Sequence, residues 1–289
     1  MIENKEIIAL FHLIDDPDIE VYSTVSDKII SFGKAIIPNL ENLWEHTPDE
    51  EIQQRIESLI HKLHFRDLTN DFINWKNGAC DLLQGALLTA QYHYPEMQAL
   101  QALQEMEKMR RNIWLELNNY LTPLEKISVL TSIYYNYYKQ KGVEIDYSKP
   151  EDFLINKTLE TKKGNAISNG IIYLVLCELL DIPVKATNIP RQFILAYFDA
   201  QYEFLNRIDE STEKIIFYID PLNGQIYSQK DVEGYFKRIN VLASPTYFKQ
   251  ISNKRIIQFL LEELSKCYDN ELNRYKMEEL QTLIKLLNE

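Results

Sequence analysis

Three side chains in the later part of this 289-residue chain are candidates for carrying nucleophilic catalysis. The candidates are the hydroxyl of Ser168, the thiol of Cys177 and the carboxylate of Asp220. A serine or cysteine nucleophile needs a neighbouring base, which is most often an imidazole. No histidine follows His93, so a nucleophile in this region would need some other base. The remaining histidines are His12, His46, His61 and His64.

Each of these three candidates also has a structural explanation. Ser168 lies in the first turn of a predicted helix, where serine commonly satisfies free backbone N–H groups. Cys177 lies about three turns further along the same helix, among leucines and valines, which predicts an inert core thiol. Asp220 precedes Pro221 at the end of a predicted strand, where turn aspartates are common. For Asp220 a structural and a functional role both remain open.

The residue types do not predict a metal or a cofactor. His61 and His64 stand three positions apart on one helix, a spacing that can bind metal, but no carboxylate or cysteine is placed to complete the shell. We expect a solvated helix end there instead. The chain has only 8 glycines, which disfavours a glycine-rich phosphate loop. The three cysteines, which show neither zinc spacing nor a disulfide framework, are Cys80, Cys177 and Cys267.

The charge balance argues against direct nucleic-acid binding. The chain has 43 acidic and 31 basic residues and a formal net charge of −12, whereas a general binder of the phosphate backbone needs a basic face. The short basic cluster at 108–111 is surrounded by Glu105, Glu107 and Glu116, which indicates a salt-bridged surface. The first residues form no signal peptide, and no apolar run reaches membrane-spanning length. We therefore expect a cytoplasmic protein without a membrane partner.

Residues 4 to about 65 have apolar positions at helical spacing. A helix begins near the sequence DDPD and breaks at Phe32 and Gly33, and a second begins at Ala35. A third has Thr47 as its predicted N-cap and Pro48 as its first residue. Helix pairs of this length resemble HEAT-type repeats, so residues 1–75 are predicted to form a helical HEAT-like region.

Residues 78–140 continue the helical pattern. A predicted helix ends at Pro95, and a long amphipathic one follows from residue 97. The next helix has Thr122 as its N-cap, with Glu125 completing a capping box. Gly142 is predicted to mark its end.

The pattern changes after residue 143. Residues 166–180 are apolar nearly all round, which predicts a helix buried on nearly every face, including at Leu179. Three strands are predicted at 183–187, 193–199 and 214–220, forming one antiparallel sheet against that helix. Two helices with a break near residue 269 follow at 251–289 and resemble a TPR-like hairpin. The fold class is therefore α+β.

A buried helix followed by antiparallel strands resembles the core of the papain-like and transglutaminase-like folds. The segments LETKKGNAISNGIIYLVLCELLDIPV, NIPRQFILAY and FYIDPLNG resemble the SirB-type transglutaminase-like proteins, often labelled regulators of sirC expression. The upstream segments DLLQGALLTAQYHYP and IWLELNNYLTPLEKISVL also resemble that family. The resemblance implies a transglutaminase-like domain at 76–250, with a C-terminal helical hairpin at 251–289.

The resemblance also places three catalytic positions. In active relatives a cysteine begins the buried helix, a histidine follows on a strand, and an aspartate orients the histidine. Here those positions are Ala166, Gln192 and Asp220, so one member of three remains. The family usually has histidine in a GHF sequence where this chain reads RQF, so this chain departs from its relatives towards less chemistry. We expect the three positions to converge in one pocket.

We therefore expect a catalytically inactive protein that acts as an interaction or regulatory module and binds a protein or peptide. A cryptic hydrolase or acyl-transferase using Ser168 and Asp220 is the alternative. A role in transcription is a third possibility, but the acidic charge favours a protein partner over DNA. The residues expected to line the cleft are Glu160, Asn165, Ser168, Asn188, Gln192 and Asp220.

Overall fold

The computed structural model describes residues 5–199 and 215–288. The chain divides into two compact units, Met1–Asn74 and Trp75–Glu289, which we call the first and the second unit. The three-part division at residues 75 and 250 stays a prediction. No helix in the described ranges combines the length and the apolar character needed to cross a lipid bilayer.

The first unit is helical. Its core includes Ile29, Leu40, Ile56 and Leu59, which are at most 1% exposed. The chain breaks after the second helix at Gly33, whose φ of 73° is one that glycine adopts readily. The HEAT-type resemblance stays a prediction. The helices are α1 (Lys5–Phe11), α2 (Ile19–Ser31), the 3₁₀ turn η1 (Gly33–Ile36), α3 (Ile37–His46) and α4 (Glu50–Asn77), whose last residues belong to the second unit.

Two expectations for this region are wrong. Helix α4 begins at Glu50, and Asp49 caps it by accepting hydrogen bonds from the N–H groups of Glu51 (2.8 Å) and Ile52 (3.2 Å). Thr47 instead closes α3, with its hydroxyl donating to the carbonyl of Leu43 at 2.7 Å. The His61 and His64 pair lies inside the 28-residue α4 and not at a helix end, because the apolar periodicity continues beyond the predicted limit.

The second unit begins with a further set of helices. The capping box is confirmed, because the N–H of Thr122 donates to Glu125 at 2.7 Å and the N–H of Glu125 donates back to Thr122 at 3.4 Å. The helices are α5 (Leu82–His93), α6 (Ala99–Glu116), α7 (Pro123–Thr131), the π-helical turn η2 (Ser132–Tyr137), the 3₁₀ turn η3 (Pro150–Phe153) and α8 (Ile155–Thr161).

The sequence predicted that Gly142 ends the helix, and this prediction is wrong. The helical path ends near Tyr138, and Lys139 makes the turn with a φ of 60°. Gly142 lies in the short strand β1 (Lys141–Gly142), which pairs in parallel with β2 (Lys163–Gly164). A Cβ at this position would stand 2.2 Å from the carbonyl oxygen of Leu222, so glycine permits a close backbone approach.

The predicted helix-and-sheet core is present in the second unit. Helix α9 (Ala166–Leu179) is followed by an antiparallel sheet in the order β3-β4-β5-β6. All three predicted strands are found within one residue of their expected limits in the described ranges; residue 214 lies outside these ranges. A two-residue fourth strand was not predicted. The strands are β3 (Val184–Thr187), β4 (Ile194–Phe198), β5 (Ile215–Ile219) and β6 (Ile226–Tyr227).

The burial expected for α9 is confirmed along most of its length. Residues Ile171, Leu174 and Val175 are at most 3% exposed. The expectation is wrong for Leu179, which is 47% exposed. The last turn of the helix reaches the surface, where Glu178 pairs with Lys185 at 3.2 Å. The apolar composition of the helix therefore did not predict where its buried part ends.

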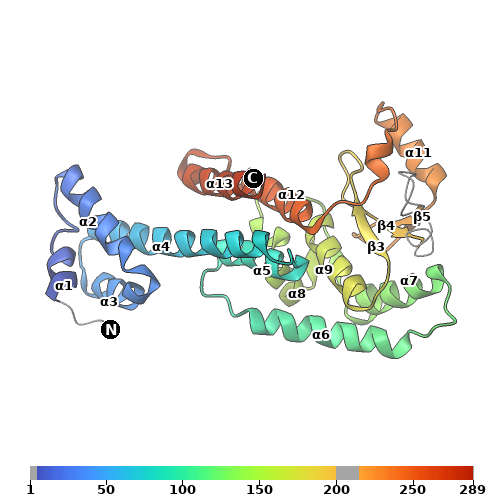
Figure 1. Ribbon diagram of the computed structural model, residues 1–289, viewed down its shortest axis with the longest axis horizontal. Coiled ribbons are helices and arrows are strands. Elements are labelled where there is room, and N and C mark those ends of the chain that lie inside the picture. Colours follow the sequence, from blue (N-terminus) through green and yellow to red (C-terminus); the bar gives the residue numbers. More distant parts are fainter. Residues whose placement is uncertain (1–4, 200–214, 289) are drawn as a thin grey trace. The chain divides into compact units, whose positions relative to one another are not determined.

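The sheet is covered on both faces (Figure 1). Helix α9 packs on β3 and β4, and α11 (Gln229–Arg238) packs through Val232 and Phe236 on the other face. Alternate residues Ile194, Ala196 and Phe198 of β4 face α11. All of β4 is therefore buried, which explains its continuous apolar sequence.

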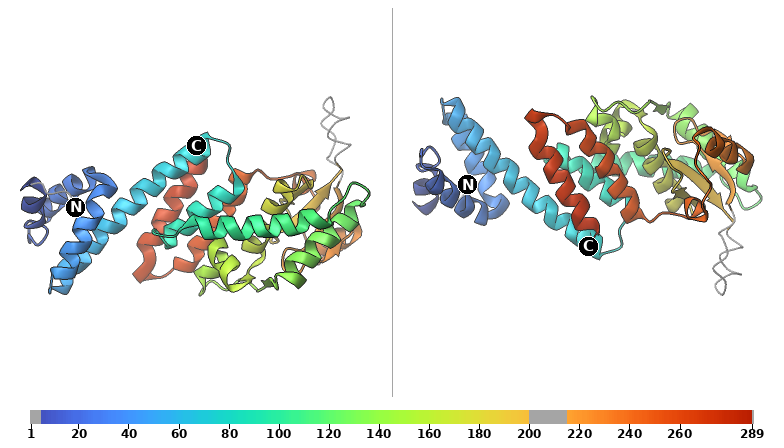
Figure 2. Two further views of the ribbon diagram at one scale, coloured as in Figure 1. Left: turned by 90° about the horizontal axis from the view of Figure 1, so that it is seen from below. Right: turned by 90° about the horizontal axis from the view of Figure 1, so that it is seen from above.

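Two helices complete the second unit and lie side by side (Figure 2). These are α12 (Asn253–Ser265) and α13 (Arg274–Asn288), with the predicted break between them. Gln258, midway along α12, donates to Asn288 at the end of α13 at 2.8 Å, and only residues 266–273 separate the two helices, so they run in opposite directions. Helix α12 also packs on α5. The TPR resemblance of this pair stays a prediction.

Candidate functional site

A cavity of about 630 Å³ opens at the first turn of α9. We call it the α9 cleft. Its walls are the start of α9, the turn at 187–193, the segment at 143–147 and one side of α12. The volume lies within the usual range for a ligand site.

Asn165 organises the helix start that faces the cleft. Its side-chain oxygen accepts hydrogen bonds from the N–H groups of Ile167 (2.9 Å) and Ser168 (3.1 Å). Asn165 itself is fully buried, whereas Ala166 is half-buried and lines the cleft. The positive end of the α9 dipole therefore lies where Ala166 presents only a methyl group.

A constrained turn positions Gln192 in the cleft wall. The N–H of Gln192 donates to the carbonyl of Ile189 at 3.3 Å, and Arg191 has a φ of 61°, which is uncommon for a residue with a Cβ. The hydroxyl of Tyr235, on α11, donates to the carbonyl of Pro190 at 2.9 Å and ties the turn to that helix. The turn is thus held from outside the cleft.

Phe193 anchors the other end of this turn. Its ring stacks on Phe259 of α12, with centroids 5.8 Å apart and planes at 7°. A Cβ on Gly170 of α9 would stand 2.5 Å from the Phe193 ring, so a glycine there lets the ring lie against the helix. The position of Gln192 therefore depends on packing from two helices.

Asp220 is engaged in its own turn. Its side chain accepts a hydrogen bond from the N–H of Leu222 at 2.8 Å, and its N–H donates to the carbonyl of Gln225 at 2.9 Å. Burial, with the charge of Asp220 and a hydrogen bond to it, raises the pKa of the Tyr227 hydroxyl. Asp220 lines a second cavity of about 710 Å³ between α11 and the sheet, which we call the α11 groove.

The three expected catalytic positions are distributed over two cavities that adjoin at Gln192. Ala166 and Gln192 line the α9 cleft, together with Asn188. Gln192 and Asp220 line the α11 groove. Gln192 thus belongs to two adjoining cavities, and the convergence of all three positions in one pocket stays a prediction.

The six polar residues expected to line one cleft lie in several different places, and their assignment as site residues stays a prediction. Ser168 is fully buried in the first turn of α9, and its hydroxyl donates to the carbonyl of Asp152 at 2.7 Å. Asn165 is buried as the helix cap, and neither residue lines a described cavity. Glu160 lines a third cavity of about 850 Å³ beside His93 and pairs with Lys157 at 2.7 Å.

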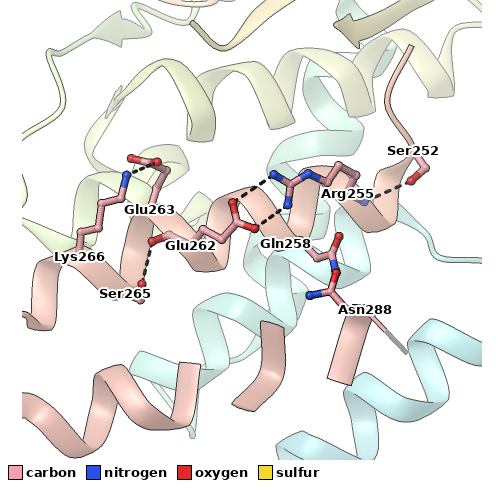
Figure 3. A network of polar contacts seen from close by, with 8 residues as sticks. All are labelled: Ser252, Arg255, Gln258, Glu262, Glu263, Ser265, Lys266 and Asn288. Atoms are coloured by element: carbon pink, nitrogen blue, oxygen red, sulfur yellow. Dashed lines mark hydrogen bonds and ion pairs between the residues drawn. The ribbon is translucent and has the colours of Figure 1, made fainter. Parts of the chain in front are cut away.

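Helix α12 supplies a charged wall that the sequence did not predict (Figure 3). Glu263 is only 9% exposed and accepts hydrogen bonds from Tyr147 (2.7 Å) and Lys266 (2.5 Å). Arg255 makes two contacts with Glu262, at 2.6 and 3.2 Å. The cations of this wall are therefore paired with carboxylates.

Asn169 is a further positioning residue that sequence reasoning missed. Its amide donates to the carbonyls of Gly164 (2.9 Å) and Lys141 (3.3 Å), and its oxygen accepts from Tyr134 (3.1 Å) and Gln140 (3.0 Å). These bonds join α9 to β1, β2 and η2. A fully buried Asn inside an apolar helix was the available signal, because buried amides require partners.

No cysteine is among the described residues that line the α9 cleft. Burial raises the pKa of the Cys177 thiol, so it stays protonated. Burial also raises the pKa of Cys267 to about 12. Within residues 5–199 and 215–288 there is no group of three or more His, Cys, Asp or Glu side chains that could hold a metal ion.

Comparison with known proteins finds a matching family and several relatives. Residues 100–262 match the family described as the transglutaminase-like superfamily. A UPF0162 protein of Buchnera aphidicola from Acyrthosiphon pisum is 28% identical over 57% of this chain and 49% of its own length. A UPF0162 protein of Vibrio cholerae is 24% identical over 62% of this chain and 63% of its own length.

Protein SirB1 of Salmonella typhimurium is 25% identical over 58% of this chain and 59% of its own length. The matched region therefore spans less than two thirds of each of these three relatives. No solved structure matches the chain significantly.

Proposed function

Because the chain belongs to the transglutaminase-like superfamily and resembles its SirB1 and UPF0162 members, we propose that it is a catalytically inactive member that binds a segment of a partner protein. The binding site is the α9 cleft. The protein acts there as an interaction or regulatory module, in the cytoplasm.

One observation carries this proposal. The cleft is retained at the place where an active relative would hold its nucleophile, but Ala166 and Gln192 occupy the positions of the thiol and the imidazole. A methyl group cannot attack a carbonyl, and a carboxamide cannot accept a proton at neutral pH. The cleft can still bind through shape and hydrogen bonds.

The alternative of a cryptic hydrolase rests on Ser168. Its hydroxyl is buried and already donates to the carbonyl of Asp152, and Asp220 lies at a different cavity. A serine nucleophile needs its hydroxyl directed towards a base and a substrate. The geometry of the described residues therefore favours binding over hydrolysis.

The proposal is tested by photo-crosslinking in the cell that produces the protein. A benzoylphenylalanine replaces Gln192 in one variant and Tyr120 in the control, because Tyr120 is 96% exposed and lines no described cavity. We expect a discrete protein to crosslink at Gln192 but not at Tyr120. Adding Ala166→Trp, which fills the cleft, should abolish that crosslink.

Two results would contradict the proposal. The first is the same set of crosslinked proteins from both positions, which would mean that the cleft selects no partner. The second is labelling of the purified wild-type protein by a serine-directed activity probe that Ser168→Ala removes, which would support the hydrolase. Circular dichroism of each variant checks that the fold is retained.

A further inference from the structure

Three residues of α11 form a stripe along one side of the α11 groove. Lys230, Gly234 and Arg238 stand at successive i, i+4 positions of the helix and all line the groove. Residues four apart lie on the same helix face, so the stripe presents two cations with a glycine between them.

Gly234 is not explained by the fold around it. Its φ is not among the positive values of the described glycines, and a Cβ built there meets no atom within 4 Å. A glycine inside a helix is less stable than alanine because its backbone loses more freedom on folding. The absence of a side chain at Gly234 therefore leaves space in the groove but does not stabilise the helix.

The groove is lined by two cations and two carboxylates, and only the carboxylates have hydrogen-bond partners in the described part of the chain. Its two carboxylates are engaged internally: Asp220 accepts from the N–H of Leu222, and Asp231 accepts from the N–H and the hydroxyl of Ser228, each at 2.7 Å. Lys230 and Arg238 have no ion pair or hydrogen bond within the described part of the chain. Two cations without a partner on one side of a cavity can pair with the carboxylates of a ligand.

We propose that the α11 groove binds an extended acidic peptide segment of a partner protein. Two positions eight residues apart on a helix are separated by about 12 Å, because each residue rises about 1.5 Å. An extended chain spans that distance in about four residues, and side chains at i, i+2 and i+4 share one face. Carboxylates at i and i+4 reach Lys230 and Arg238, while residue i+2 lies over Gly234.

The floor of the groove accommodates such a segment. Ile189, Ile194 and Val232 line it with apolar surface next to the stripe. The hydroxyl of Tyr235 is already used by Pro190, so the ring contributes mainly its face. The recognised pattern is thus acidic, any residue, small apolar, any residue, acidic.

This inference rests on the proposed function because both make the chain a peptide-binding protein. The inference places the peptide in a different cavity, the α11 groove. Gln192 and Leu222 line both cavities, so one partner can contact both. The α9 cleft differs on its α12 side, where Arg255 and Lys266 are paired with carboxylates.

The direct test uses the full chain and a fluorescein-labelled synthetic peptide in which two glutamates stand four positions apart, with valine midway and serine or threonine between. Fluorescence anisotropy at low salt should show saturable binding. Replacing both glutamates by glutamine should weaken binding about tenfold or more, and added salt should weaken the glutamate peptide. Absence of saturable binding would overturn the inference.

Variants locate the peptide on the stripe. Lys230→Ala and Arg238→Ala should each weaken binding about threefold to fivefold, whereas Lys237→Ala, which removes a neighbouring cation outside the groove, should not. Gly234→Ala should weaken binding by about tenfold because the new methyl group occupies the room for residue i+2. Its thermal unfolding midpoint should not fall, which separates lost binding from lost folding.

The outcomes distinguish this inference from the proposed function. Equal affinities for wild type, Arg238→Ala and Gly234→Ala overturn the inference. If Ala166→Trp abolishes peptide binding while the α11 variants do not, the peptide occupies the α9 cleft, so the proposed function stands and this inference fails. If the peptide binds the stripe but no partner is crosslinked at Gln192, the inference stands and the proposed role of the α9 cleft fails.

Discussion

At the residue scale, the proposed site depends on the residue types at two positions. Ala166 begins the buried helix α9, and Gln192 lies just before strand β4. Both face the α9 cleft. Asp220 lies in a turn, where its carboxylate accepts a backbone hydrogen bond. Under the proposed function, Ala166 and Gln192 occupy the positions of a thiol–imidazole pair without its chemistry.

Ala166→Cys combined with Gln192→His should create a reactive thiol. The helix N-terminus favours the thiolate, and a nearby imidazolium lowers the thiol pKa further. With Cys80, Cys177 and Cys267 replaced by alanine, we expect iodoacetamide to alkylate the double variant faster at neutral pH than Ala166→Cys alone. Little turnover should follow, because an oxyanion hole must also be present. Equal alkylation rates from pH 5 to 9 would show that the two positions do not face each other.

His93 should make the protein less stable in mild acid. Burial, assisted by the charge of Lys276, lowers its pKa below the usual value, and its Nδ1 lies 2.8 Å from the hydroxyl of Tyr268. The unfolded state binds the proton more readily, so the free energy of unfolding falls as the pH drops through about 6.5. Well above that pH the ring is neutral in both states and contributes no pH dependence.

The comparison that isolates this effect is His93→Gln against wild type. Urea unfolding at several pH values between about 5 and 8 should give a difference in free energy that changes in the acidic range and is constant in the alkaline range. Parallel curves over the whole range would contradict the assignment.

At the element scale, the short capping signals had mixed outcomes. The capping box at Thr122 and Glu125 located the start of α7 correctly. Thr47 failed as a cap because Asp49 stands closer to the apolar periodicity and accepts two N–H bonds. Both residue types are good caps, so only the hydrogen bonds show which of them is used.

Thr122→Ala should lower the free energy of unfolding of the second unit by about 1 kcal/mol, since an N-cap is lost. Ser128→Ala is the matched control in the same helix; its hydroxyl bonds only the carbonyl of Leu124, and alanine has the higher helix propensity. Chemical denaturation of the three proteins gives the comparison. A larger loss for Ser128→Ala than for Thr122→Ala would refute the capping role.

At the scale of the whole molecule, each unit has its own core. The first unit is built around Leu40, Ile56 and Leu59, and the second around α9 and the sheet. Both cavities discussed above, the α9 cleft and the α11 groove, are lined only by residues of the second unit. The proposed binding of a partner peptide therefore involves residues of that unit.

Leu59→Ala should act on the first unit alone. Removing a fully buried leucine costs about 2–5 kcal/mol, because transfer energy is lost and a cavity remains. Hydrogen exchange followed by mass spectrometry should show faster exchange in α1, α2 and α3 and unchanged exchange in α9. Faster exchange in α9 as well would mean that the two cores unfold together.

The amino-acid sequence by itself determined the elements and the absence of certain chemistry. The apolar run from Ile167 to Cys177 and the β-branched strands after it predicted α9 and its sheet, because local periodicity and residue shape govern those choices. That no histidine follows His93 is equally a property of the sequence.

Only the tertiary structure decided which of these residues meet. It buried Ser168 beneath the carbonyl of Asp152, brought α12 to the α9 cleft and placed Gln192 between two cavities. It also showed that Gly234 faces open space. Periodicity states which side of an element is buried but not which distant element covers it. That choice depends on the packing of side chains that are far apart in the chain.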